Sequence, residues 1–253
     1  MANRLTLIYP YYNAPLMLQA QLFNWLVVPD KWKRLLTVIL IDDCSLEKPA
    51  LPVVEAVGKL GFDFRLYRVK DDIPWNQHGA RNLGVKEAPD GCWLFLSDID
   101  HTLPAHVIVS LMERMLDKNA FYTMKRLTAV RNGPETVEYE LMLDSQDRPK
   151  PHPNTFLVTK NVFWKAGGYD EDYCGCYGGD GPFRKWLDRS ARHVHLDDAH
   201  VVRWSRDLIP DASLQPEMRA KYKPLYKPRF DAKGGGRASK PMNWIRFQWE
   251  RLI

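Results

Sequence analysis

Residues 92–100 read Cys92-Trp93-Leu94-Phe95-Leu96-Ser97-Asp98-Ile99-Asp100 and carry the strongest signal for the fold. Its apolar first half predicts a strand buried on both faces, as in a parallel sheet. In open α/β sheets ligands bind beyond the carboxyl ends of the strands, which is where Asp98 and Asp100 fall. Residues i and i+2 of an extended segment point the same way, so both carboxylates could approach one divalent cation. The alternative is a turn in which these side chains bond neighbouring backbone N–H groups.

A second apolar run, residues 36–41 (LTVILI), also ends in carboxylates, those of Asp42 and Asp43. Because parallel strands end at one edge of a sheet, we expect the four carboxylates to share that edge. Asp43 or Ser45 could instead cap the following helix. Arg81, in a predicted helix, could pair with Asp42 or with a phosphate, or form an exposed salt bridge.

Strands and helices alternate along the chain to about residue 120, a pattern that predicts βαβ units and a parallel sheet. Asn13 is predicted to cap the first helix, and a hairpin is expected around Asn132-Gly133-Pro134. An exposed loop is predicted over 144–153 and a Gly-rich acidic loop over 167–181. The predicted strands cover residues 5–9, 36–41, 64–69, 92–96, 121–130, 136–143, 154–159 and 193–204, and the later helices cover 52–60, 76–88, 105–116, 161–166 and 182–190.

The composition is typical of a soluble globular protein, with 253 residues of which 45% are hydrophobic and 26% charged. It excludes a wholly disordered chain and a short disulfide scaffold, and no apolar run approaches the roughly 20 residues that cross a bilayer. The N-terminal apolar stretch is too short for a signal peptide and is predicted to be a strand. The four scattered cysteines lack the spacing of a zinc site and indicate a reduced, cytoplasmic setting.

Between Leu208 and Ile253 the chain carries ten Lys and Arg against four Asp and Glu, so the net charge of +5 belongs to this extension. Gly234-Gly235-Gly236 is a predicted hinge, and aromatic residues follow from Trp244 onward. Three interpretations stay open. The extension could bind nucleic acid through phosphate contacts and stacking, lie on an anionic membrane, or fold back over the core with its cations facing solvent.

Taken in order, the motifs resemble those of the GT-A glycosyltransferases, in particular the family 2-like group. The matching segments are residues 9–13 (YPYYN), 39–45 (ILIDDCS), 79–85 (GARNLGV), 94–100 (LFLSDID), 167–171 (GGYDE) and 177–180 (YGGD). The resemblance spans residues 4–205 and implies an α/β, Rossmann-like, mostly parallel central sheet flanked by helices. The domains it implies are a GT-A domain over 1–207, with a nucleotide-sugar half (1–104) and a smaller mixed acceptor half (105–207), and a basic C-terminal extension (208–253).

The resemblance also implies which residues hold the nucleotide sugar. Tyr12, which follows Pro10, matches the residue that packs against the nucleobase, and Asp42 matches the one that hydrogen-bonds it. Arg81 matches a position that supports the nucleotide end, and Asp98 lies at the donor diphosphate.

The same resemblance implies a metal. Asp98 and Asp100 match the pair that ties Mn²⁺ or Mg²⁺ to the donor diphosphate, where the cation neutralises charge on the departing group. His200 looks like a late histidine that completes the metal shell in several relatives, with a structural role in a strand as the alternative. This chain has Ser97 where many relatives carry an acid, so either Asp could be the direct ligand.

Family 2-like enzymes carry an acidic pair before a helix, one member of which accepts the proton of the attacking hydroxyl. Here the loop keeps Asp180, the expected general base, and has Gly181 in the partner position. Asp170, Glu171 and Asp172 are the alternatives. A carboxylate base suits a single displacement that inverts the anomeric carbon, although a retaining mechanism stays open.

The resemblance therefore implies a metal-dependent transferase that moves a sugar from a nucleotide-sugar donor, UDP-linked by family habit, to a hydroxyl acceptor. The acceptor could be a glycan, a lipid-linked molecule or, with the extension as binding segment, DNA or RNA. A nucleotidyltransferase and a non-catalytic nucleotide- or glycan-binding module are the alternatives. The expected location is cytoplasmic, with the extension able to reach a membrane surface.

Overall fold

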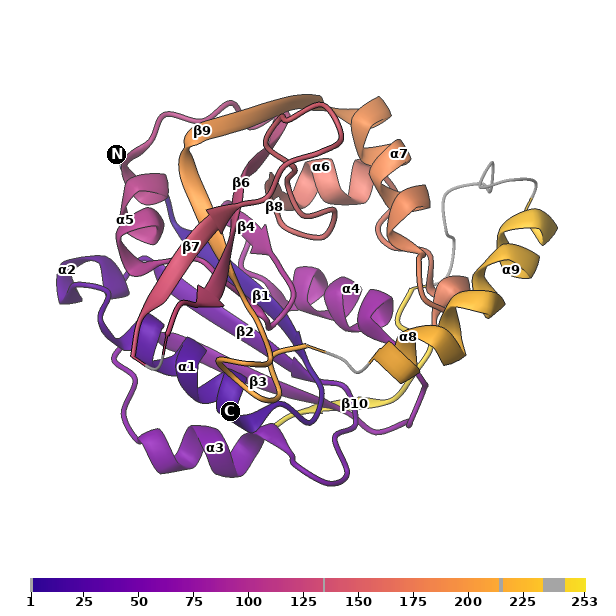
Figure 1. Ribbon diagram of the computed structural model, residues 1–253, viewed down its shortest axis with the longest axis horizontal. Coiled ribbons are helices and arrows are strands. Elements are labelled where there is room, and N and C mark those ends of the chain that lie inside the picture. Colours follow the sequence, from indigo (N-terminus) through magenta and orange to yellow (C-terminus); the bar gives the residue numbers. More distant parts are fainter. Residues whose placement is uncertain (1, 134, 214–215, 234–243) are drawn as a thin grey trace.

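The computed structural model describes residues 2–133, 135–213, 216–233 and 244–253. Within them a central sheet lies between two layers of helices (Figure 1). The strands are β1 (Leu5–Tyr11), β2 (Leu36–Asp42), β3 (Asp63–Val69), β4 (Trp93–Leu96), β5 (His101–Thr102), β6 (Ala120–Arg131), β7 (Val137–Leu141), β8 (Phe156–Thr159), β9 (Arg192–Trp204) and β10 (Trp249–Arg251). The helices are α1 (Pro15–Leu26), α2 (Asp30–Lys33), α3 (Ala50–Val57), α4 (Gln77–Glu87), α5 (Ala105–Glu113), α6 (Lys160–Lys165), α7 (Asp180–Ser190), α8 (Pro216–Tyr222) and α9 (Tyr226–Ala232), with short 3-10 turns at Glu171–Tyr173 and Lys223–Leu225.

The sheet has a parallel half and a mixed half. Its strand order is β10-β3-β2-β1-β4-β8-β6-β9-β5, and β7 pairs with β6 as the predicted hairpin. Strands β3, β2, β1 and β4 run parallel to one another. Beyond them β8 is antiparallel to β4 and to β6, and β9 runs parallel to β6. The predicted α/β architecture is confirmed, with one sheet running through both predicted halves; the exact domain limits stay a prediction.

The central strands are buried on both faces because their side chains alternate between two cores. In β2, Val38 and Leu40 face a core shared with α1, α3 and α5, whereas Ile39 and Ile41 face a core shared with α4, α6 and α7. All seven residues of this strand are buried. Fully burying one such side chain stabilises the folded state by about 1.5–3 kcal/mol. Because a shift of the strand would expose several of them, burial on both faces fixes where the strand ends.

Helix α4 carries polar side chains into the interior. Residues 78–85 are all buried, including His78, Arg81 and Asn82. The helix lies close against β1, because a Cβ at Gly84 would come within 2.4 Å of Ile8 Cγ2. Since α4 follows the parallel strand β3, its first turns start at the carboxyl edge of the sheet and bring these polar groups there.

The start of α1 differs from the prediction. Asn13 has a φ of 48° and its side-chain oxygen accepts a hydrogen bond from Lys48 N at 2.9 Å. The helix begins at Pro15, and the carboxylate of Asp211 accepts hydrogen bonds from Leu16 N (2.8 Å) and Met17 N (2.9 Å). The predicted cap is therefore wrong: a carboxylate from a distant loop takes its place.

The described parts of the C-terminal extension fold back onto the molecule. Strand β10 pairs antiparallel with the outer edge of β3, and α8 and α9 lie beside the Gly-rich loop (Figure 1). Phe247 is buried against α4, where a Cβ at Gly79 would come within 2.4 Å of its ring. The predicted hinge at Gly234-Gly235-Gly236 lies outside the described residues. No helix in the described part of the chain is long and apolar enough to span a membrane.

Candidate active site

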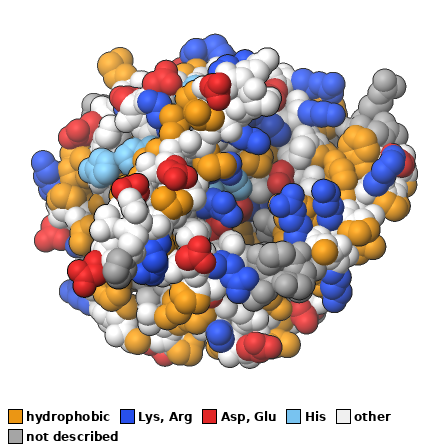
Figure 2. All heavy atoms as spheres, in the orientation of Figure 1, with side chains coloured by type: hydrophobic (Ala, Val, Ile, Leu, Met, Phe, Trp, Pro, Cys, Tyr) orange, Lys and Arg blue, Asp and Glu red, His pale blue; other side chains and the backbone are white. Residues whose placement is uncertain are grey.

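The carboxyl ends of β1, β2 and β4 meet at one rim of the sheet. The parallel register sets Tyr11 beside Asp42 and Ile8 beside Leu96, and Asp98 follows two residues later. Figure 2 shows acidic, basic and histidine side chains around a hollow near the middle of this face of the molecule. The predicted convergence of polar side chains at the strand ends is therefore present.

Asp98 is bound to the buried arginine of α4. One oxygen of Asp98 forms an ion pair with Arg81, whose side chain is fully buried. The guanidinium also donates to Gln77 Oε1 at 3.0 Å and lies 5.3 Å from the centre of the Tyr169 ring. A fully buried arginine needs a carboxylate partner, so Arg81 fixes the position of Asp98.

The second carboxylate of the motif orients a histidine. Asp100 Oδ1 lies 2.7 Å from His101 Nδ1. His101 is 2% exposed, and its Nε2 is buried with no hydrogen-bond partner among the described residues. Histidines that bind metals usually donate their other ring N–H to a carboxylate, which fixes the tautomer and the ring. This pair has that arrangement, with Nε2 left for a ligand.

A second histidine comes from the segment before β8. His152 Nδ1 lies 3.2 Å from Thr155 Oγ1, and its Nε2 lies 3.5 Å from Asp98 Oδ2. Its ring packs on that of His101 at 4.2 Å between centroids. Burial lowers the pKa of His152 well below its ordinary value, so the ring stays neutral, the form that binds metals.

These three side chains, Asp98, His101 and His152, form the rim cluster, in which one ligand atom from each lies within 4.8 Å of the others. Two imidazoles and a carboxylate form a donor set that suits Mn²⁺ and related transition metals better than Mg²⁺. The buried, unpartnered His101 Nε2 is the atom that such a metal would satisfy. The residues present therefore fit a divalent metal.

Two predicted metal ligands lie outside the rim cluster in this structure, and their role as ligands stays a prediction. Asp100 lies at the rim but is bonded to His101. His200 lies on β9 opposite Lys125, with its ring 5.5 Å from that of His106 on α5. The structure brings His101 and His152, and not His200, to Asp98, because β9 reaches the motif only at Arg203 and beyond.

Two further arginines face the rim cluster. Arg203 Nε lies 3.9 Å from Asp100 Oδ2. The Nε of Arg126 is buried without a hydrogen-bond partner in the described structure, and burial together with the charge of Arg203 lowers the Arg126 pKa. Arginine is well suited to bidentate recognition of phosphate, so this pair is available to an anionic ligand.

Asp180, the predicted base, lies beside the same arginine. It is the first residue of α7, its side chain is 24% exposed, and it interacts electrostatically with Arg81. Burial raises the pKa of Asp180, but His78, Arg81 and Asn154 together hold it below its ordinary value. A carboxylate that is ionised and partly exposed can accept a proton. At the predicted partner position, a Cβ on Gly181 would meet nothing within 4 Å.

The three alternative acids are occupied in holding the C-terminal extension. Glu171 accepts hydrogen bonds from Asn82 Nδ2 (2.9 Å) and from the backbone N of Ile245 (2.5 Å) and Arg246 (3.0 Å). Asp170 and Asp172 each lie 2.5 Å from Lys233 Nζ. Asp180 is therefore the acid of this loop that is free to meet a ligand.

At the nucleotide end, Asp42 is buried and hydrogen-bonded to the backbone. It is 1% exposed, and its two oxygens accept hydrogen bonds from Ser45 N (2.8 Å) and Ala50 N (2.9 Å). Oδ1 thus holds the turn at Ser45 and Oδ2 holds the start of α3. The predicted hydrogen bond from a nucleobase to Asp42 stays a prediction.

Asp43, the residue after Asp42, has fewer hydrogen-bond partners among the described residues and is the more suitable group for contacting a base. Asp43 is 8% exposed, accepts a hydrogen bond from Asn76 Nδ2 at 3.0 Å, and has its pKa raised by burial to about 7. Tyr12 is 42% exposed, and partial burial together with the charges of Asp72 and Asp43 raises its pKa. Pro10 lies two residues earlier in β1, partly buried. Tyr12 offers an open aromatic face beside a carboxyl that burial keeps partly neutral.

The sequence interpretation missed five side chains of this site, namely His78, His101, Arg126, His152 and Arg203. A signal existed for His101, which directly follows the acidic motif. His152 lies in the segment that was predicted to be an exposed loop, and its side chain is 14% exposed. Only the pairing of distant strands brings it to the rim.

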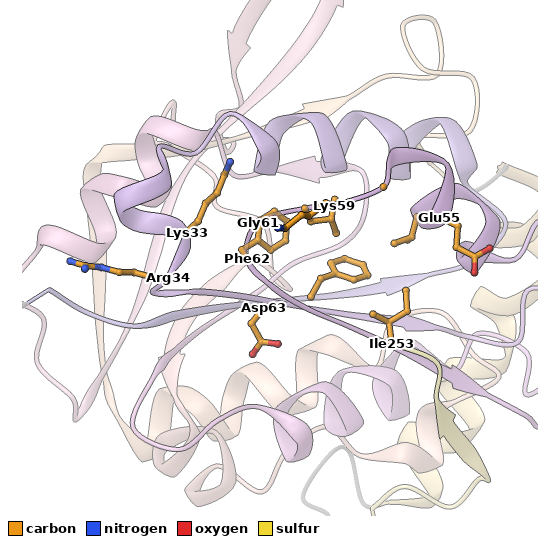
Figure 3. A pocket seen from close by; sticks show the side chains of 12 residues that line it. Lys33, Arg34, Glu55, Lys59, Gly61, Phe62, Asp63 and Ile253 are labelled. Atoms are coloured by element: carbon orange, nitrogen blue, oxygen red, sulfur yellow. The ribbon is translucent and has the colours of Figure 1, made fainter.

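A separate cavity of about 650 Å³ lies between α2, α3 and β3. Figure 3 shows Lys33, Lys59, Phe62 and Ile253 among its lining residues. No residue of the rim cluster lines it. This cavity is therefore separate from the rim cluster.

Comparisons with known proteins agree with this geometry. A family model described as glycosyl transferase family 2 matches residues 6–177. No curated protein gives a significant sequence match.

Among solved structures, Staphylococcus aureus TarS 1-349 in complex with UDP-GlcNAc has a TM-score of 0.62 at 16% identity, covering 85% of this chain and 63% of that one. GalNAc-T7 with UDP, GalNAc and Mn²⁺ has a TM-score of 0.57 at 13% identity, covering 81% and 44%. The mannosyltransferase PcManGT from Pyrobaculum calidifontis with GDP-Man and Mn²⁺ has a TM-score of 0.58 at 15% identity, covering 95% and 72%. The chain thus spans less than two thirds of the length of the first two proteins. At these sequence identities the similarity shows the fold alone, and this is the predicted GT-A fold.

Proposed function

The chain belongs to glycosyl transferase family 2, and from this premise we propose that it moves a sugar from a nucleotide-sugar donor to a hydroxyl acceptor, with a divalent metal and inversion of the anomeric carbon. The similar structures are complexes with UDP-GlcNAc, with UDP, or with GDP-Man, two of them with Mn²⁺. A UDP- or GDP-linked sugar is therefore the donor class to test first.

The observation that carries the proposal is the rim cluster beside Asp180. Asp98, His101 and His152 offer three ligand atoms within 4.8 Å of one another, and Arg81 contacts Asp98 and faces Asp180. A metal-ligand set and an ionised acid are thus joined by one buried arginine at the carboxyl rim of the sheet, where α/β proteins bind ligands.

Asp98, His101 and His152 would hold the metal, and Asp100 would fix the ring of His101. When bound, a divalent cation supplies charge neutralisation to the nucleoside diphosphate. The donor set favours Mn²⁺ over Mg²⁺, because imidazole nitrogens suit transition metals whereas Mg²⁺ prefers oxygen.

The protein's own cations and aromatic rings would bind the rest of the donor. Arg126 and Arg203 face the rim with donors to spare and would grip the diphosphate. Tyr12 would stack on the base, and Asp43, whose pKa near 7 leaves part of its population protonated, could donate to or accept from the base edge.

Asp180 would act on the acceptor. As the acceptor oxygen forms its bond to the anomeric carbon, the hydroxyl proton passes to the Asp180 carboxylate and the nucleoside diphosphate leaves with the electron pair of the broken glycosyl bond. Because attack and departure occur on opposite faces of the sugar, the configuration inverts. The low pKa of Asp180 keeps it deprotonated at neutral pH.

The test is the release of nucleoside diphosphate from UDP- and GDP-sugars by the purified chain, with Mn²⁺ and after chelation. We expect release to require metal, and His101→Ala and His152→Ala to abolish it. His200→Ala is the matched control, a histidine outside the rim cluster whose loss should leave release intact. Asp180→Asn should slow transfer by about 10²–10⁴-fold while donor binding persists.

The alternatives give different results. Release of pyrophosphate would identify a nucleotidyltransferase. A nucleotide sugar that raises the melting temperature but never turns over would identify a binding module. Loss of metal dependence in His200→Ala but not in His101→Ala would contradict the rim cluster as the metal site.

A further inference from the structure

His78 is a buried histidine of the site that has no step in the proposed reaction. It lies in the first turn of α4, its side chain is 0% exposed, and its ring packs 5.3 Å from that of Tyr169. Neither ring nitrogen has a hydrogen-bond partner within normal geometry among the described residues. Leaving a buried polar atom unpaired costs about 1–3 kcal/mol, so a histidine at this position calls for a partner.

The nearest candidate partner is the base itself. His78 Nε2 lies 3.5 Å from Asp180 Oδ1, an oxygen that is likewise buried without any other partner in the part of the chain that the structure describes. Hydrogen bonds of catalytic groups are often long before substrate binds and shorten in the complex. A shift of a few tenths of an ångström would satisfy both groups at once.

The loop before α7 is built to allow this approach. A Cβ at Gly179 would lie 2.6 Å from His78 Cε1 and 2.7 Å from His78 Nε2. The φ of Gly179 is −67°, an ordinary value for any residue, so the backbone does not require glycine there. The missing side chain instead provides the space in which the imidazole reaches the carboxylate.

We propose that His78 is a positioning residue for the reaction, one that donates its Nε2–H to Oδ1 of Asp180 and so directs Oδ2 toward the acceptor hydroxyl. This inference rests on the proposed function, in which Asp180 is the base. The carboxylate of an aspartate can rotate about its side-chain bonds. Holding one oxygen in place therefore increases the fraction of the time in which the other oxygen faces the acceptor hydroxyl.

The surroundings of Asp180 support the pairing. After burial, the largest influence on the pKa of Asp180 comes from His78, which lowers that pKa. The other groups that face Asp180 are Arg81, Asp98, Asn154, Tyr169, Cys176 and Tyr226. Of these, Arg81 is already bound to Asp98 and Gln77, and Asn154 is a second hydrogen-bonding side chain beside the carboxylate. The approach to Oδ1 is made by His78.

The experiment compares four variants in steady-state transfer assays: two at His78, Asp180→Asn, and a double variant. His78→Met keeps the volume but has no donor, whereas His78→Gln places an amide N–H close to where Nε2 stands. We expect His78→Met to lower kcat about 10–100-fold with the donor KM changed by less than about threefold, because orientation matters in the reaction and not in donor binding. His78→Gln should recover most of that loss.

The double variant His78→Met/Asp180→Asn separates positioning from folding. If the two residues act as a unit, the double variant should be no slower than Asp180→Asn alone. An extra loss of the full His78→Met factor, or a His78→Gln variant as slow as His78→Met, would overturn the proposal. Failure of the proposed function is distinct: the parent chain would then release no nucleoside diphosphate, or Asp180→Asn would retain full activity.

Discussion

Replacing Asp43 with Asn should stabilise the protein more strongly at pH 8 than at pH 5. Asp43 is buried, and its pKa is raised from the ordinary 3.8 to about 7. As pH rises through this interval the unfolded chain loses the proton while the folded chain retains it. Stability therefore falls between the two values and is level above the upper one.

The size of the effect follows from the two pKa values. Each unit of difference corresponds to about 1.4 kcal/mol. The titration of Asp43 therefore opposes folding by about 4 kcal/mol at pH 8 and by about 2 kcal/mol at pH 5. Asn keeps the acceptor for Asn76 Nδ2 and does not ionise, so the gain from the substitution should be about 2–3 kcal/mol larger at pH 8 than at pH 5.

Urea unfolding of the ligand-free protein at the two pH values measures this difference directly. Glu47→Gln is the control, an exposed carboxylate of the same loop whose loss should change stability by no more than about 0.5 kcal/mol at either pH. An Asp43→Asn gain of the same size at both pH values would refute the reasoning, since it would mean that folding leaves the proton affinity of Asp43 unchanged.

The same variant probes function. A buried carboxyl that weakens the fold is expected to be retained for a task, and sites with such shifts gather around ligands. If Asp43 contacts the base, the Asp43→Asn substitution should make the chain more stable and yet weaken its binding of nucleoside diphosphate, which calorimetry would detect.

Three other changes test the framework of the site. Asp100→Ala should weaken Mn²⁺ binding about 10–100-fold, because His101 loses the carboxylate that orients it; a Mn²⁺ titration that matches the parent would contradict that role. Glu171→Ala removes a carboxylate that accepts hydrogen bonds from one buried and two partly buried donors, and it should lower the free energy of unfolding by about 3 kcal/mol in urea. A loss below about 1 kcal/mol would mean that the extension is not held through it. Gly84→Ala should cost about 1–3 kcal/mol in the same assay, since its Cβ would meet Ile8; unchanged stability would show that α4 can move away from β1.

The strand ends could be predicted because their signal is local. An apolar run such as LTVILI can be accommodated by few structures, and the polar residues that follow it mark the rim. The different hydrogen-bond partners of Asp42 and Asp43 could not be predicted. The segment after β2 presents the backbone N–H groups of Ser45 and Ala50 to Asp42, whereas Asn76, at the start of α4, presents its side chain to Asp43. A motif of two adjacent acids does not encode that geometry.

The histidines show a different limit. His101 follows the acidic motif and could have been considered from the sequence. His152 and His78 acquire their roles from partners distant in the chain, Asp98 and Asp180 respectively, and a polar segment such as residues 144–153 reads as an exposed loop in isolation. Deriving their roles requires the register of β8 against β4 and the close approach of α7 to α4.

The pairing of β10 with β3 has a consequence for how the molecule behaves among its own copies. The outer side of β3 would otherwise present a row of free backbone amides and carbonyls, together with the Tyr67 ring that Trp249 now covers. Such an open margin is a template onto which a neighbouring chain can add a strand, the first step of aggregation. Strand β10 covers this edge with the chain's own residues, and the Lys70–Glu250 ion pair lies along it. The segment that holds Phe247 against α4 therefore also protects the molecule from aggregation.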